Sequence, residues 1–146
     1  MIRGVHQLAL YGVGSLTCFA LALATERAAA AAPFVSSIHA MPLPSQTKVF
    51  DQRTRGGQDL GGGRLCTART RILLRSEQSL STLKTHYAKH KVRSASGDAE
   101  VNGKVYRVGD VKDLVPEWDR HRKDGKVYLV EFISPGTPGT EADCKL

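Results

Sequence analysis

The segment LCTARTRILLR, residues 65–75, decides the fold because its side chains alternate with the period of a β-strand. The even positions, from Cys66 to Leu74, are mostly small or apolar, whereas three odd positions are Arg69, Arg71 and Arg75. Successive side chains of a strand point to opposite faces of a sheet. The segment therefore predicts a strand whose even positions face a core and whose odd positions form a row of arginines on the other face.

The arginine row is the most specific basic feature of the chain, and we interpret it as a candidate anion-binding face. Its surroundings are also basic: residues 48–93 carry 11 Lys and Arg against 3 Asp and Glu, whereas residues 94–146 carry 8 against 10. The whole chain of 146 residues has a formal net charge of +7, which favours an acidic partner. The simpler alternative is a solvated outer face whose charges prevent strand-to-strand aggregation.

A second strand is predicted from VYLVEFI, residues 127–133, which is strongly apolar and is expected at the centre of the sheet. Glu131 is its one charged residue. An acid inside an apolar strand is a candidate general acid or base, although such a residue more often pairs with a neighbouring arginine. Glu131 is therefore a weak catalytic candidate.

A helix is predicted over residues 77–90, between the two strands. Ser76 can act as its N-cap, and Glu77 is favourable in the first turn because it faces the positive end of the helix dipole. An apolar stripe at helical spacing is expected to pack on the sheet: Leu80, Leu83 and Tyr87.

Two histidines, His86 and His90, are four positions apart and therefore share one face of this predicted helix. The zinc-protease motif HExxH uses the same spacing, but here Tyr87 replaces the glutamate and Lys89 would repel a cation. We therefore expect a histidine pair at the solvent edge and predict no metal site.

Turn and cap residues between the predicted helix and the second strand indicate a hairpin and a short helix. Asn102-Gly103, flanked by valines, is typical of a type I′ hairpin turn. Apolar residues recur at helical spacing after Asp110, so we expect a helix with Asp113 as its cap and Pro116 in its first turn. The predicted fold is a small α+β domain, with a mostly antiparallel sheet, one or two helices packed on one face, and one disulfide.

Residues 31–63 are predicted to be an extended, glycine-rich lead-in, and the compact domain is placed at residues 64–146. Residues 31–46 contain three prolines and no formal charge, which is typical of an extended segment. A short strand is expected at 47–50. The segment RGGQDLGGG, residues 55–63, contains five glycines and is expected to form a loop.

Residues 1–30 are predicted to be a secretory signal peptide. The run from Leu8 to Ala24 has 17 residues without a formal charge, which suits the apolar segment of such a peptide. It is marginal for a membrane span, which needs about 20 residues. Small-residue motifs predict cleavage after Ala24 or Ala30, and the alternative is an uncleaved anchor. We therefore expect a secreted or periplasmic protein that contacts a membrane only if this segment stays attached.

Cleavage would remove Cys18 and leave two cysteines, Cys66 and Cys144. An even cysteine count in an oxidising compartment predicts one disulfide between them. The alternative, a redox or metal-binding pair, lacks the CxxC spacing.

Familiar catalytic and cofactor-binding motifs are missing from the sequence. There is no GxSxG nucleophile motif, and the glycines at 61–63 precede a strand, whereas a phosphate-binding loop precedes a helix. We predict no cofactor. The favoured function is a non-catalytic binding module of the inhibitor, immunity-protein or ligand-binding kind, whose partner is an acidic protein or an anionic ligand.

The alternative function is a small secreted hydrolase that acts on a polyanion, with a ribonuclease as the concrete form. Acid–base cleavage of RNA needs a Glu/His or His/His pair beside an arginine at the phosphate. The weak candidates for these roles are His86, His90, His121 and Glu131. Nucleic acid is thus a less favoured partner than an acidic protein.

Overall fold

The computed structural model describes residues 33–58 and 65–138, which form an α+β fold around a mostly antiparallel sheet. The strands are β1 (Thr47–Gln58), β2 (Leu65–Ser76), β3 (Lys91–Arg93), β4 (Glu100–Asn102), β5 (Lys104–Arg107) and β6 (Val127–Pro138). Helix α2 spans Leu80–Lys89, and residues 33–39 are also helical. Two short 3-10 helices are η1 (Val108–Asp110) and η2 (Pro116–His121).

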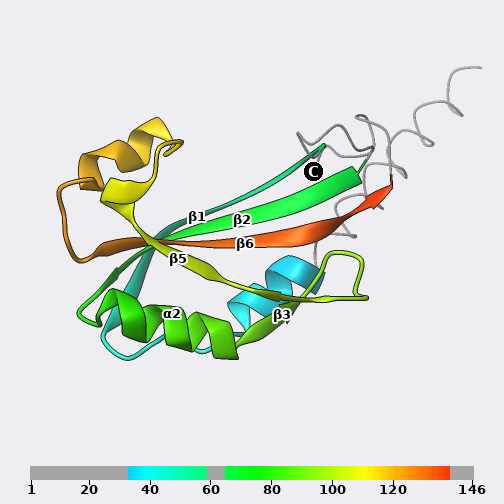
Figure 1. Ribbon diagram of the computed structural model, residues 1–146, viewed down its shortest axis with the longest axis horizontal. Coiled ribbons are helices and arrows are strands. Elements are labelled where there is room, and N and C mark those ends of the chain that lie inside the picture. The colour runs from blue at the N-terminus through cyan, green and yellow to red at the C-terminus, as the bar shows by residue number, and fades with distance from the viewer. Residues whose placement is uncertain (1–32, 59–64, 139–146) are drawn as a thin grey trace, which may run out of the picture.

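The main sheet has four strands in the order β1-β2-β6-β5, and every neighbouring pair in it is antiparallel. The apolar strand β6 lies between β2 and β5, which confirms its predicted central position (Figure 1). Strands β3 and β4 form a separate two-stranded sheet. Since β1 pairs with β2 alone, it is an edge strand of the main sheet as far as the described residues show.

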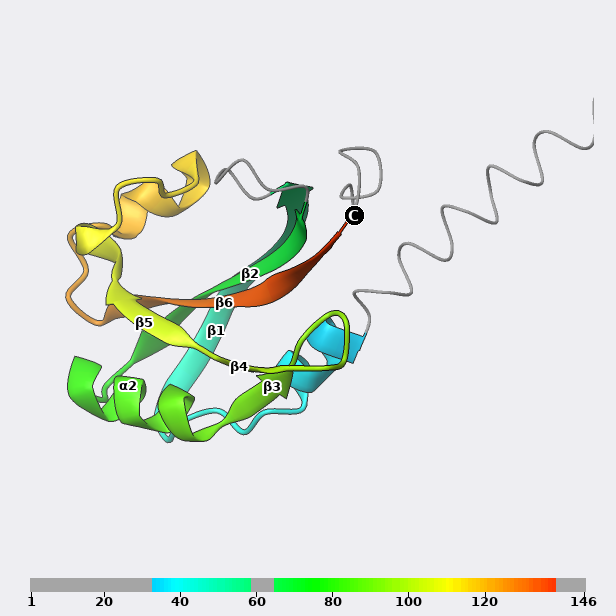
Figure 2. The ribbon, with the colours of Figure 1, turned by 45° about the vertical axis from the view of Figure 1, so that its right-hand side comes forward.

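One face of the main sheet carries the larger core, because α2 and the helical residues 33–39 both pack on it (Figure 2). The predicted alternation in β2 is confirmed: Ala68, Thr70, Ile72 and Leu74 are all buried. The predicted helix stripe is confirmed as well, since Leu83 and Tyr87 are 0% exposed and Leu80 packs against them. Full burial of each large apolar side chain stabilises such a core by about 1.5–3 kcal/mol.

Within residues 33–58 and 65–138, the opposite face is covered at one end, by η1, η2 and the segment between them (Figure 1). A smaller apolar cluster lies there, made of Leu73, Val108, Val111, Trp118, Val127 and Leu129. The predicted helix α2 thus packs on one face, where the unpredicted helical residues 33–39 join it, while the 3-10 helices add a partial layer on the other face. The remainder of this second face carries the arginines of β1 and β2.

The predicted start of the helix at Glu77, with Ser76 as its cap, is wrong. Strand β2 continues through Ser76, whose N–H donates to the Lys126 carbonyl at 3.0 Å. Because its backbone belongs to the sheet, Ser76 cannot begin a helix. Helix α2 instead begins after Ser79, whose hydroxyl accepts a hydrogen bond from the Thr82 N–H at 3.1 Å.

The predicted Asn102-Gly103 hairpin is wrong, because the two strands that flank it find different partners. Strand β4 pairs with β3, whereas β5 pairs with β6. Gly103 is buried, and a Cβ atom there would lie 2.7 Å from the ring of Phe132 and 3.0 Å from Val130. The glycine therefore permits close packing between the two sheets and does not form a turn.

The helix predicted after Asp110 is replaced by the 3-10 helix η2, and Asp113 does not cap it. Val115 is the N-cap of η2, and Pro116 lies in its first turn as expected. Both the backbone carbonyl and the side chain of Asp113 accept hydrogen bonds from Arg71, a residue 42 positions earlier in the chain. This long-range contact keeps Asp113 outside a helix.

The predicted extended lead-in is wrong for residues 33–39 and 55–58, whereas the strand expected at 47–50 is present within β1. Residues 33–39 are helical, and Phe34 and Ile38 are 0% and 3% exposed within the larger core. Strand β1 runs through residues 55–58, which were predicted to be part of a loop, and pairs there with β2. The compact domain therefore includes the described residues before residue 64.

Several sequence predictions concern residues outside the described ranges. These are the signal peptide at residues 1–30, the glycines at 61–63 and Cys144. Cys66 lies in β2 opposite Thr137 of β6. Among the described residues, no helix is both long enough and apolar enough to cross a membrane.

Candidate anion-binding site

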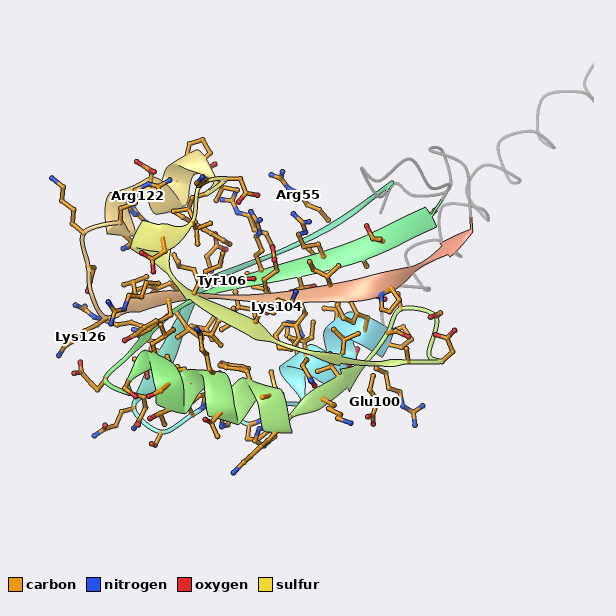
Figure 3. All side chains as sticks on the ribbon, viewed as in Figure 1. Arg55, Glu100, Lys104, Tyr106, Arg122 and Lys126 are labelled. Carbon is orange, nitrogen blue, oxygen red and sulfur yellow. The ribbon has the colours of Figure 1, made fainter. Side chains whose placement is uncertain are left out.

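Arginines of two neighbouring strands face each other on the side of the sheet opposite α2. Arg53 of β1 is paired with Arg71 of β2, and Arg55 is paired with Arg69. Side chains at paired positions have Cβ atoms about 4.5–5.5 Å apart, and like charges so placed destabilise a sheet. Figure 3 shows Arg55 projecting from this face. Four positive groups are therefore held together at a cost in stability unless counter-charges offset it.

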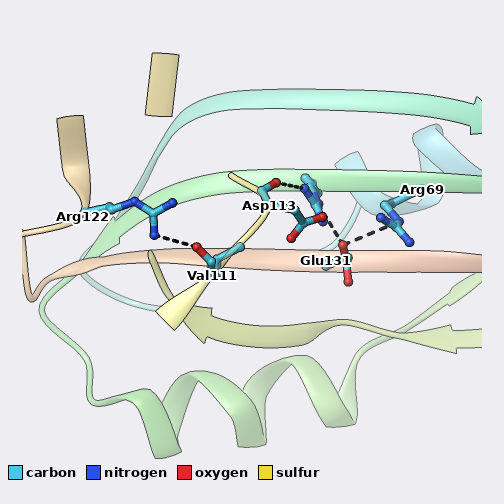
Figure 4. Close-up of polar contacts among 6 residues, drawn as sticks. Arg69, Val111, Asp113, Arg122 and Glu131 are labelled. Atoms are coloured by element: carbon cyan, nitrogen blue, oxygen red, sulfur yellow. Dashed lines mark hydrogen bonds and ion pairs between the residues drawn. The ribbon is translucent and has the colours of Figure 1, made fainter. Parts of the chain in front are cut away.

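Arg71 receives such counter-charges from two other elements. Its Nε donates to a Glu131 carboxylate oxygen at 2.8 Å, and its Nη1 and Nη2 donate to the backbone carbonyl and carboxylate of Asp113 at 2.9 and 2.7 Å. The Arg71 side chain is only 14% exposed. Figure 4 shows Asp113 and Glu131 close to each other, with Arg69 reaching Glu131 from its other side. Arg71 is therefore fixed in place, with most of its donors occupied.

The shifts in the pKa values of Arg71 and Asp113 indicate that both groups remain charged in their contact. Burial alone would lower the pKa of Arg71, but its hydrogen bonds to Asp113 and Glu131 outweigh this effect and raise it. The hydrogen bond from Arg71 lowers the pKa of Asp113 below its ordinary value, against the opposing effect of burial. Both groups thus stay ionised at neutral pH.

Arg55 and Arg69 keep more of their binding capacity. The Arg69 Nε lies 3.6 Å from the same Glu131 oxygen that already accepts from Arg71, and its side chain is 48% exposed. The Arg55 side chain is exposed and makes no hydrogen bond or ion pair with another described residue. Two directly opposed guanidinium groups therefore lack a full counter-charge of their own.

Arg53 forms the wall of the site together with Trp118. Its guanidinium lies 5.5 Å from the centre of the Trp118 ring, at cation–π distance. The indole N–H donates to Asp51 at 2.7 Å, and Arg53 bonds to Asp51 and Glu117 at 3.2 and 3.4 Å. The hydrogen bond from Trp118 is the main reason why the pKa of Asp51 is lowered.

These side chains enclose a pocket of about 290 Å³, lined by Arg53, Arg55, Arg69, Arg71, Asp113, Val115 and Trp118. Most of the lining is cationic, while Val115 and Trp118 supply an apolar wall. Guanidinium groups match the geometry of carboxylates and phosphates, to which they donate paired hydrogen bonds. The arrangement can therefore hold an anionic group between Arg55 and Arg69.

The third arginine of the predicted row, Arg75, lies apart from this pocket. Leu73 separates it from Arg71 along the strand and is buried beneath the 3-10 helices. Arg75 pairs with Asp124 at 3.1 Å and borders a different depression, together with Lys48. The structure thus brings Arg69 and Arg71 together and leaves Arg75 out.

The weak catalytic candidates are not gathered in one place. His86 lies on α2 and His90 is its C-cap, across the sheet from the arginines, with ring centres 4.2 Å apart. His121 of η2 stacks on Phe50. Glu131 borders the arginines, but none of the described histidines lines the pocket. No group of three potential metal ligands occurs among the described residues.

Arg53 and Arg55 were missed by sequence reasoning, because the glycines that follow them suggested a loop. The signal that could have found them is the alternation of Asp51, Arg53 and Arg55, which has the period of a strand. No protein-family model, curated protein or solved structure matches this chain.

Proposed function

We propose that the protein is an exported, non-catalytic binding module whose arginine pocket binds an anionic group of its partner. The observation that carries this proposal is the directly opposed pair Arg55 and Arg69, which has little counter-charge of its own. Beside it, Arg71 is held by Glu131 and Asp113, so the pocket keeps its shape without a ligand. An anion placed between the two open guanidinium groups would relieve their repulsion.

The expected affinity for a ligand follows from the hydrogen bonds that its anionic group can accept from the arginines. A hydrogen bond to a charged group contributes about 1.5–3 kcal/mol to a complex, and Arg55 and Arg69 can each donate more than one. Apolar parts of a ligand can pack on Val115 and Trp118. A carboxylate or phosphate attached to an apolar group therefore suits the pocket better than a fully hydrated polyanion.

Binding is preferred to RNA cleavage because the groups needed for acid–base catalysis are not assembled around the arginines. Glu131 is the acid nearest to them, and its carboxylate is occupied by Arg71 and lies close to Arg69. A general base must reach the proton that it abstracts, and the described histidines lie elsewhere. An RNA-cleavage assay on the purified protein separates the two functions, because a binding module leaves the RNA intact.

We also propose that a disulfide between Cys66 and Cys144 stabilises the exported domain. Cys66 is paired with Thr137 across β2 and β6, and Cys144 follows Thr137 by seven positions in the sequence. Such a length of extended chain reaches up to about 25 Å, so the tail can return to Cys66. A bridge that closes this long loop would stabilise the fold by roughly 4 kcal/mol. Alkylation followed by intact mass measurement should detect no free thiol on Cys66 and Cys144 before reduction and two afterwards.

The fluorescence of Trp118 offers a direct test of the pocket, because it is the one tryptophan of the chain and lines the site. Inorganic phosphate, citrate and benzoate are titrated against the purified protein at several salt concentrations. We expect a saturable change in emission that weakens as salt rises. Replacing Arg55→Gln together with Arg69→Gln should weaken binding at least tenfold.

The matched control is Arg93→Gln with Arg107→Gln, which removes the same charge and the same residue type. Both control residues are exposed, and neither lines the pocket. The control pair should bind the probes as the unmodified protein does. The proposal is overturned if none of the three anions gives a saturable change, or if the two double variants lose affinity equally.

A further inference from the structure

We infer that the open edge of β1 binds an extended acidic segment of a partner protein as an added strand, which places carboxylates in the arginine pocket. This inference rests on the proposed function and names the partner of the same site. Among the described residues, β1 pairs with β2 alone. Apart from that ladder, no backbone hydrogen bond joins residues 47–58 to another described segment. An unpaired strand edge is a template for strand addition.

The geometry of β1 supports a regular added strand along its second half. The register of β1 with β2 shifts once, between Val49 and Asp51, and then runs without interruption to Gln58. A Cβ atom added to Gly57 would meet no atom within 4 Å. The sheet face at Gly57 is therefore open, and the uninterrupted register gives this half of β1 the regular backbone that pairing with a second chain requires.

The side chains of β1 define the chemistry of the added strand. Arg53 and Arg55 are two positions apart and both line the pocket, because alternate residues share a face. A neighbouring strand would set its own alternate side chains about 5 Å from them. Acidic residues at positions i and i+2 of the partner would therefore lie opposite Arg53 and Arg55. Arg69, the next arginine inward, would then be within reach of the same carboxylates.

A second copy of this chain is a poorer occupant of the edge. The antiparallel register that sets Asp51 opposite Arg53 of the other copy leaves Arg55 opposite Val49, without a counter-charge. The register that sets Asp51 opposite Arg55 instead places Arg53 opposite its own counterpart. Two arginines that face each other in this way repel, in addition to the Arg53–Arg71 pair already present. The charge of the strand thus favours an acidic partner over self-association.

The test uses three synthetic peptides of ten residues in which Glu and Thr alternate. The parent peptide is unmodified, one derivative is N-methylated at every Glu, and the other is N-methylated at every Thr. All three carry the same charge, but each derivative loses the hydrogen-bond donors of one edge only. Binding is followed by Trp118 fluorescence and by hydrogen exchange of the β1 amides.

We expect the parent peptide to bind and to slow exchange in residues 51–58, and one derivative to bind at least tenfold more weakly than the other. The inference is overturned if the two derivatives bind equally, if the parent peptide does not bind, or if light scattering shows that the β1 edge forms a dimer. Phosphate, citrate and benzoate need no strand edge. If these anions bind and the two derivatives do not differ, strand addition fails while the proposed function stands.

Discussion

Arg71 and Glu131 face each other across β2 and β6, and a hydrogen bond of 2.8 Å joins the Arg71 Nε to a Glu131 carboxylate oxygen. The two side chains are only 14% and 11% exposed. An ion pair removed from water in this way is costly to form and costly to break. It links the central strand to the arginine face and holds the pocket of the proposed function in shape.

Replacing Glu131→Gln should therefore lower the free energy of unfolding by about 2–4 kcal/mol, because it removes the negative charge paired with Arg71 and leaves only a neutral acceptor there. Urea unfolding of the variant measures this loss. The control is Glu100→Gln, which removes an exposed partner of Lys91 and should cost less than about 1 kcal/mol. Equal losses in the two variants would show that the Arg71–Glu131 pair has no special structural role.

Acidification should weaken the contacts that hold the arginines in place, because the pKa of Asp51 and that of Asp113 are both lowered in the folded protein. A carboxyl group whose pKa is lower in the folded than in the unfolded protein stabilises the fold at pH values above its unfolded pKa, near 4. This stabilisation is lost as the pH falls through the folded pKa. The emission of Trp118 should report the protonation of Asp51, with a midpoint below the ordinary 3.8. In Asp51→Asn this transition should vanish, and its persistence would contradict the assignment.

Tyr87 carries the one buried side-chain polar atom that lacks a hydrogen-bond partner within the described part of the chain. Its burial raises the pKa of the phenol to about 12. Tyr87→Phe should therefore keep or increase the free energy of unfolding, by up to about 1 kcal/mol. Tyr128→Phe is the contrast, because the Tyr128 hydroxyl donates to the Gln78 carbonyl and its loss should destabilise the protein. A marked loss of stability in Tyr87→Phe would mean that its hydroxyl has a partner in solution.

Gly103→Ala should destabilise the protein by about 1–3 kcal/mol, because the new methyl group would lie 2.7 Å from the ring of Phe132. Gly125→Ala is the matched control, since a Cβ atom there would meet nothing within 4 Å. Thermal unfolding of both variants distinguishes them. If Gly103→Ala were as stable as the control, glycine would not be required for the packing of the two sheets.

The strand pattern of the fold could be predicted where periodicity and burial agree. The alternation along β2 located the core face correctly because one face of that strand packs on the larger core. The apolar run of β6 located the central strand because its side chains are buried on both faces. Local turn signals were less reliable. Asn102-Gly103 has the residues of a hairpin turn, but β4 and β5 find stronger partners in β3 and β6.

The candidate site could be predicted only in part, because it depends on contacts distant in sequence. Arg69 and Arg71 follow from the alternation of β2, but their pairing with Arg55 and Arg53 depends on the register of β1. Asp113 could not be predicted as their neighbour, since only the folded chain brings it to Arg71. Arg75 is paired with Lys48 in β1 and with Val127 in β6, and the buried Leu73 separates it from Arg71, so it belongs to a different surface.

The most direct test of the central claim is an NMR titration of the arginine Nε–Hε signals with inorganic phosphate. If the pocket binds an anion, the signals of Arg55 and Arg69 should shift and saturate together, with one dissociation constant. The signals of Arg93 and Arg107, which lie outside the pocket, should show no saturable shift. Equal shifts at all four arginines, or no saturation at Arg55 and Arg69, would contradict the account.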